Sequence, residues 1–252
     1  MDYSTTMNNS HHPAIELNNI AVAEIDNGNN LDAITNLKKA LAIAKRCWSN
    51  TPDHELVVVV GDENDCNKAK RKTSLDDFVS SSRSGSATAF DEDTNNRSSF
   101  LYRQAIHLEP DAIGRDNRSR QQLSAVIVFN LALAHHLIAE TDETQQYNCF
   151  TMRAAKLYEL SWQLVQREVG YNSPLFMMVI VNNLGVAYQS LGEVENAQRS
   201  FEHLLSTMLF LMDCGHHHKI FAKATKNHSN LQEGFFRNVS PLFLHQSTAA
   251  AA

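Results

Sequence analysis

The chain has 252 residues, a formal net charge of −6, and only 9 glycines and 5 prolines. Its length allows a buried core without disulfide or metal cross-links, and its scarcity of turn-forming residues argues against sandwiches and barrels and favours an all-α fold. The acidic balance argues against nucleic acid and membrane surfaces as partners.

The N-terminal region predicts a disordered start followed by a helical hairpin. Residues 1–13 are polar and lack the apolar core of a secretory signal. Residues 14–48 carry apolar residues at helical spacing, so we expect a first antiparallel hairpin there. No two cysteines form a CxxC pair, which favours reduced thiols and an intracellular, cytoplasmic location. The cysteines are Cys47, Cys66, Cys149 and Cys214.

A polar insert interrupts the helical pattern. Residues 61–97 are rich in Ser, Asp and Asn, and they cannot bury enough apolar surface to offset the entropy of ordering, so we expect disorder. Two apolar stretches flank the insert. The valine run at 57–60 favours a strand. Residues 100–108 fit either a helix that ends at Pro110 or a strand paired with the valine run, and we favour the small two-stranded ribbon.

Internal repetition is the strongest pattern in the chain. Leu184-Gly185 is followed by Tyr188, and then by Ala197 and Phe201. This spacing resembles the tetratricopeptide repeat, in which small residues let two antiparallel helices approach and large residues fill the gaps. The same spacing recurs at 17–40 and, with a polar insertion, at 130–161.

A longer-period subtype is indicated within residues 98–215, where we expect the remaining tetratricopeptide-like helices. The interval from Ala154 to Ala197 exceeds the roughly 34 residues of the usual repeat. The surrounding sequence resembles the repeats of kinesin light chains. This resemblance implies an α-solenoid of elongated helices and a role as a cargo or peptide adaptor. It is carried by Leu157-Tyr158-Glu159-Leu160, Gln166 to Gly170, Pro174 and Asn182-Asn183-Leu184-Gly185.

An asparagine precedes the small-residue pair in each of the three repeats, at Asn19, Asn130 and Asn183. In the resembled family this place faces a concave groove, where an amide can donate to and accept from a peptide backbone without selecting a sequence. We therefore expect an asparagine ladder that binds an extended peptide. The alternative is that these are buried structural asparagines. A clamp that binds carboxylates would need Lys and Arg at groove places on the first helix of each repeat. We do not expect such a clamp, because those places are occupied by Asn18, Val22, Val179 and Asn183.

Other candidate chemistry is sparse. Cys214 and His216 to His218 form the most metal-like string, but adjacent ligands cannot all reach one ion, and we expect a polar loop without metal. His135 and His136 are expected to lie one buried and one exposed on a core helix, and with Asn130 they interrupt residues 123–139, so no membrane span is expected. No phosphate loop, nucleophile elbow or metalloprotease motif is present, so we expect neither enzymatic activity nor a cofactor.

These patterns predict an interaction scaffold that binds a protein or peptide segment in a helical-repeat groove. Two alternatives stay open. The first is a metal-dependent enzyme that uses Cys214 and the histidines at 216–218. The second is a structural subunit whose groove is occupied by its own C-terminal segment, since residues 216–252 are expected to contain a loop and an apolar cap around Leu231 to Leu244.

Overall fold

Helices are the only regular secondary structure in the residues that the computed structural model describes, which are 12–48, 99–109, 117–141, 147–166, 174–213 and 229–249. This confirms the predicted all-α class. All of these residues belong to one compact unit, and a second unit, Asp53–Ser98, lies outside them. The valine run and the insert at 61–97 fall in that second unit. The helices are α1 (His12–Asp26), α2 (Asn30–Trp48), α3 (Asn117–Thr141), α4 (Tyr147–Gln166), α5 (Pro174–Ser190), α6 (Val194–Asp213) and α8 (Ser229–Ala249).

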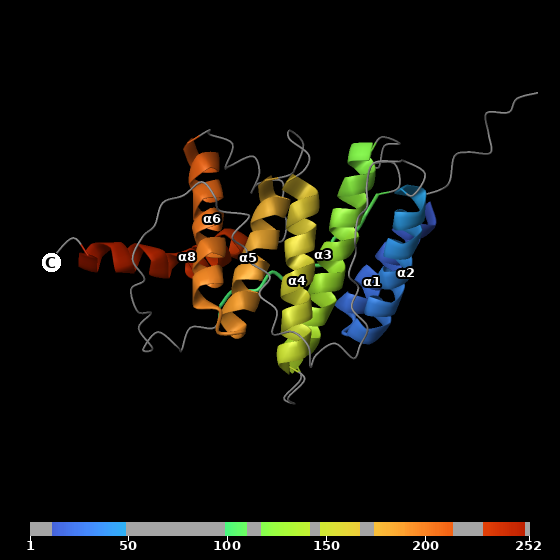
Figure 1. The fold of residues 1–252 in the computed structure, drawn as a ribbon, viewed down its shortest axis with the longest axis horizontal. Helices are drawn as coiled ribbons and strands as arrows, with labels where there is room; N and C mark the ends of the chain where they lie inside the picture. Colours follow the sequence, from blue (N-terminus) through green and yellow to red (C-terminus); the bar gives the residue numbers. More distant parts are fainter. Residues whose placement is uncertain are drawn as a thin grey trace, which may run out of the picture. The chain divides into compact units, whose positions relative to one another are not determined.

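The helices pack in chain order. Each helix from α1 to α6 contacts the next, α3 also contacts α1, and α8 contacts α6 (Figure 1). The helices bury an apolar core whose largest fully enclosed side chains include Tyr158, Phe129 and Phe235. Because neighbours in sequence are neighbours in space, the packing of each helix is determined mainly by the helices before and after it.

The turns after α1 and α5 have the same geometry. Gly28 and Gly192 both adopt positive φ, at 79° and 74°. In each turn the glycine N–H donates to the carbonyl three residues earlier, and the next N–H donates to the carbonyl five residues earlier, at 2.8–3.1 Å. This is a Schellman helix end, which favours glycine because other residues are strained at positive φ. Two helical hairpins of the chain therefore share one local design.

The contact between α5 and α6 depends on a missing side chain. A Cβ atom on Gly185 would lie only 2.5 Å from Cε1 of Phe201, and Ala197 is buried in the same hairpin. This agrees with the expectation that the small residue Gly185 lets the two helices α5 and α6 approach each other. Glycine permits the close approach, and the Phe201 ring fills the space.

The central helix α3 is mostly buried. The part of α3 from Ser119 to Thr141 is long and apolar enough to cross a membrane. However, 83% of its most apolar stretch is buried inside the protein, as is common in a core helix. His135 and His136 are both buried, at 5% and 2% exposure, so the expectation that one is exposed is wrong. Both can be buried because α3 is enclosed on several sides, so its buried surface is wider than the single stripe of a surface helix.

One cysteine departs from expectation. Cys149, near the start of α4, is disulfide-bonded, so the prediction of reduced thiols is wrong for this residue. Disulfide pairing depends on which Cα atoms approach within about 7 Å in the fold, and isolated positions in a sequence carry no such information.

Residues 99–109 form neither helix nor strand. The helix ending at Pro110 is therefore wrong, and the two-stranded ribbon that we favoured is not confirmed, because residues 100–108 form no strand. The valine run with which they were expected to pair lies outside the described residues. The backbone of this segment instead makes its hydrogen bonds to asparagine side chains of the helices.

Candidate functional site

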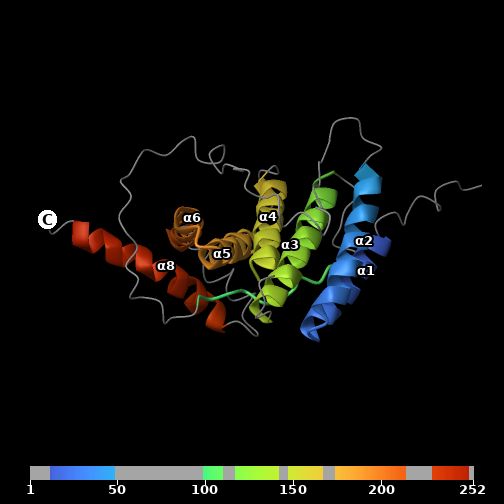
Figure 2. The same ribbon diagram turned by 60° about the horizontal axis from the view of Figure 1, so that its bottom comes forward.

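Six asparagines from four helices lie on one surface, which we call the asparagine face. They are Asn18 and Asn19 on α1, Asn130 on α3, Asn182 and Asn183 on α5, and Asn238 on α8. All are buried except Asn19, which is partly exposed. Residues 99–109, which we call the ladder segment, run along this face. Figure 2 shows the segment in green, passing from α8 across α5 and α3 toward α1.

The two central asparagines each bind both main-chain groups of one residue. Asn183 Oδ1 accepts a hydrogen bond from Tyr102 N at 2.9 Å, and its Nδ2 donates to Tyr102 O at 2.9 Å. Asn130 does the same with Ile106, at 2.8 Å and 2.9 Å. An amide side chain used in this way replaces a neighbouring β-strand, since it presents one acceptor and one donor to the extended backbone.

The two ends of the segment are bound by the same arrangement. Asn238 pairs with the N–H and C=O of Phe100, both at 2.8 Å. Asn19 pairs with those of Leu108, at 2.9 Å and 2.8 Å. The paired residues are separated by even numbers of positions, because every second residue of an extended chain directs its main-chain groups to the same side. Gln104, at the centre, has no such partner within the described part of the chain.

The asparagines are linked to one another in two matching trios. In the first, Asn238 Nδ2 donates to Asn182 Oδ1 at 2.8 Å, and Asn182 Nδ2 donates to Asn183 Oδ1 at 3.1 Å. In the second, donation runs from Asn130 to Asn18 at 2.9 Å and from Asn18 to Asn19 at 3.2 Å..

The middle asparagine of each trio has the same additional task. Asn182 gives a second hydrogen bond to Phe100 O at 3.0 Å, and Asn18 gives one to Ile106 O at 3.1 Å. The same device is therefore built twice, on segment residues six positions apart. Each amide is fixed by its neighbour, so the face is preorganised for a peptide backbone.

The side chains of the segment are unequally buried. Leu101 and Leu108 are buried at 6% and 8% exposure, whereas Arg103, Gln104 and His107 are exposed. Arg103 forms an ion pair with Glu140 of α3 at 2.9 Å, on the surface. The segment is thus anchored by its backbone and its apolar ends, with a polar central part.

The aromatic groups near the face support its geometry. Tyr158 is fully buried, and its hydroxyl accepts a hydrogen bond from Asn183 Nδ2 at 3.2 Å. Burial raises the pKa of Tyr158 far above its usual value, so this hydroxyl stays neutral. The Tyr102 ring lies 6.4 Å from that of Phe129. These rings hold the centre of the face in place.

The structure brings the three predicted residues together. Asn19, Asn130 and Asn183 all lie on the asparagine face, and each binds the backbone of one segment residue. Three further members were missed: Asn18 and Asn182 stand directly before predicted ones, whereas Asn238 belongs to the region predicted as a cap. The occupant of the face in the described part of the chain is the ladder segment and not the C-terminal segment, because α8 forms part of the surface itself.

The described residues contain no group of three or more His, Cys, Asp or Glu side chains that could hold a metal ion. Cys214 and the histidines at 216–218 lie outside those residues. A partly buried polar pair lies elsewhere: the Tyr188 hydroxyl donates a hydrogen bond to Glu159, and desolvation by burial raises the pKa of both groups.

Comparison of the chain with protein-family models, with curated proteins and with solved structures finds no match. The geometry therefore defines the class of this protein: it is an all-α protein with a preorganised surface for an extended backbone.

Proposed function

We propose that this protein is a non-enzymatic interaction module, a tetratricopeptide-like helical solenoid that binds an extended protein segment on its asparagine face. The proposal rests on one observation, the duplicated asparagine trio. Each trio satisfies main-chain groups that every peptide carries, so the face suits any extended chain of compatible shape. The matching turns at Gly28 and Gly192 support the repeat architecture.

The ladder segment is, in this proposal, an internal occupant that a partner must replace. Because the segment belongs to the same chain, it competes for the asparagine face at an effective concentration of about 1 mM. A free peptide that makes the same contacts therefore binds poorly to the closed protein, in which the segment occupies the face. Release of the segment exposes the asparagine amides to water, which then takes the place of the lost hydrogen-bond partners. A new extended chain that presents the same main-chain groups can replace that water and bind the open face.

A second candidate is a structural one, in which the segment permanently ties the helices together. The observation in its favour is that the segment already satisfies the asparagine face. In that case the segment cannot leave without loss of the fold, and the protein has no free peptide site on this surface. The two candidates predict different behaviour when the segment is weakened.

The test uses the full chain with its segment weakened only at the backbone. Tyr102→Pro and Ile106→Pro together remove two N–H donors that the asparagines bind. The matched control, Gln104→Pro with His107→Pro, introduces the same number of prolines at positions whose main-chain N–H groups have no partner within the described residues. Binding of a fluorescent peptide with the sequence of residues 99–109 is followed by anisotropy.

We expect the Tyr102→Pro/Ile106→Pro variant to keep its helical circular dichroism and to bind the peptide at least 10-fold more tightly than the control variant. Addition of Asn130→Ala and Asn183→Ala to that variant should weaken binding again. Loss of helical structure on weakening the segment, or absence of peptide binding by a folded variant, contradicts the proposal and favours the structural candidate.

A further inference from the structure

A ladder of asparagines alone leaves the register of its ligand undetermined. The amides contact only main-chain atoms, and these repeat every two residues along an extended chain. A peptide displaced by two residues, or by the six that separate the two trios, could offer the same donors and acceptors. A defined register therefore requires a side-chain feature at some point of the face.

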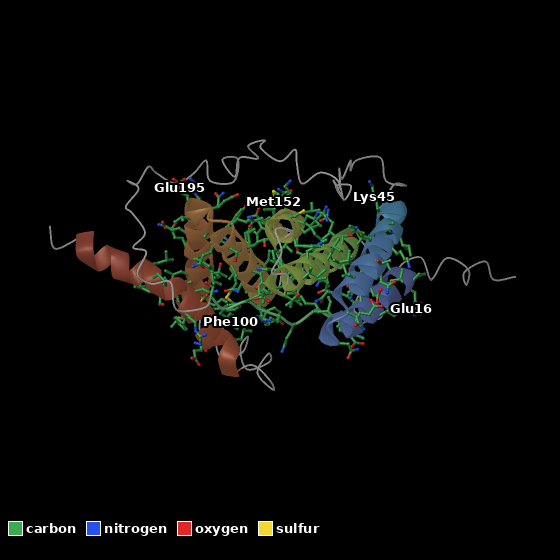
Figure 3. The ribbon with its side chains drawn as sticks, turned by 90° about the horizontal axis from the view of Figure 1, so that it is seen from below. Glu16, Lys45, Phe100, Met152 and Glu195 are labelled. Carbon is green, nitrogen blue, oxygen red and sulfur yellow. The ribbon has the colours of Figure 1, made fainter. Side chains whose placement is uncertain are left out.

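Such a feature exists at Gly234 of α8, one helical turn before Asn238. A Cβ atom on Gly234 would lie 2.3 Å from Cγ of Phe100 and 2.5 Å from both Cδ atoms, so the ring rests directly on the helix backbone. Phe100 is labelled in Figure 3. The Phe235 ring meets the Phe100 ring edge-on, at 6.0 Å between centroids and 79° between planes. We call this place the glycine notch.

The notch is specific to an aromatic ring. Glycine within a helix is less favourable than alanine, so its presence in α8 calls for a compensating contact. Any side chain at position 234 would occupy space that the ring now fills. The flat Phe100 ring lies against the bare backbone and gains an edge-to-face contact, the favoured geometry for aromatic pairs.

The second trio carries a different pair at the equivalent places. One helical turn before Asn130 stands Val126, and the segment residue paired with Asn130 is Ile106. A branched aliphatic residue thus replaces the aromatic one, and a valine replaces the glycine. The two trios are alike toward the backbone, and they differ in the side chains that accompany them.

We infer that the glycine notch sets the register and the direction of the bound peptide, and that the ligand class is an extended peptide with an aromatic residue followed, six positions later, by a branched aliphatic residue. This inference rests on the proposed function and specifies its ligand. The aromatic residue binds at α8, the aliphatic residue at α3, and the peptide runs from α8 toward α1. The polar centre of the ligand is unrestricted, as the exposed Arg103 and Gln104 are here.

The test compares two peptides of identical composition against the Tyr102→Pro/Ile106→Pro protein. One has the sequence of residues 99–109, and the other carries Phe100→Ile with Ile106→Phe, so that the aromatic and aliphatic residues are exchanged. We expect the exchanged peptide to bind at least 10-fold more weakly. Gly234→Val in the protein should remove this preference, because it fills the notch, while circular dichroism confirms that α8 remains folded.

The outcomes separate this inference from the function on which it rests. Equal binding of both peptides, or an unchanged preference after Gly234→Val, overturns the notch and leaves the proposed function standing. Absence of binding by either peptide overturns the proposed function, and this inference with it. A 10-fold preference that Gly234→Val abolishes supports both.

Discussion

Replacing Asn130 by alanine tests how strongly the asparagine face holds its segment. Asn130 Oδ1 accepts from Ile106 N at 2.8 Å, and its Nδ2 donates to Ile106 O and to Asn18 Oδ1, both at 2.9 Å. Alanine removes all three bonds. The Ile106 carbonyl keeps its bond from Asn18 at 3.1 Å, but the Ile106 N–H loses its partner. With about 1 kcal/mol for each bond and a further cost for the unpaired N–H, we expect Asn130→Ala to lower the free energy of unfolding by about 2–4 kcal/mol.

The loss of unfolding free energy has an upper limit if the ladder segment can dissociate while the helices stay folded. Once the segment dissociates from a folded helical scaffold, further weakening of its contacts costs the fold nothing more. The Asn130→Ala/Asn183→Ala double variant should then lose less stability than the sum of the two single variants. A fully additive loss indicates a segment that cannot leave without unfolding.

The measurements are urea unfolding followed by circular dichroism and hydrogen exchange of the Ile106 amide. The control is Asn196→Ala, because this asparagine lies outside the face and its side chain bonds, among the described residues, only to Glu193 near its own turn. The prediction is refuted if Asn130→Ala is as stable as Asn196→Ala to within about 0.5 kcal/mol and the Ile106 amide is still protected from exchange. The asparagine face would then contribute little to holding the segment.

Three further predictions concern the helices. Gly185→Leu should lower the free energy of unfolding by about 1–3 kcal/mol, because its side chain must displace the Phe201 ring, and an unchanged melting temperature would contradict the helix contact described above. Gly28→Ala should cost about 1–2 kcal/mol, because φ is 79° there, and denaturant unfolding equal to wild type would argue against the Schellman turn. Burial lowers the pKa of His135 to about 3 and of His136 to about 4. The unfolded chain, with histidine pKa values near 6.5, therefore takes up protons first as pH falls, and stability should decrease below pH 6.5 by up to about 1.4 kcal/mol per pH unit for each histidine. Urea unfolding at pH 7 and pH 5 checks this, and a His135→Gln/His136→Gln variant with the same pH dependence as wild type would show the assignment to be wrong.

The helical fold and part of the site were predictable because they depend on local spacing. Gly185 and Ala197 recur with large residues at fixed intervals, and such intervals define helix contacts whatever the rest of the chain does. Asn19, Asn130 and Asn183 were identified for the same reason, since asparagine is a poor helix former and its recurrence at one repeat place requires a cause.

The occupant of the face could not be predicted. Residues 100–108 have apolar spacing that suits helix or strand, and their conformation is decided by side chains up to 138 positions away in the sequence. No local pattern carries that information. Asn238 was missed because α8 does not repeat the spacing of the earlier helices, so its asparagine stands outside the pattern that reveals the others.

The path of the ladder segment also bears on how the protein folds. Stacked helices that touch only their neighbours can form and fray piecemeal from either end. Here one segment bonds to α8 through Phe100 and to α1 through Leu108, at sequence separations of 138 and 89 residues. The outermost helices are thereby coupled to each other as well as to their neighbours. Closing such distant contacts is slow in folding, but once made they turn a row of independent hairpins into a single cooperative unit, in which the ends melt together with the middle.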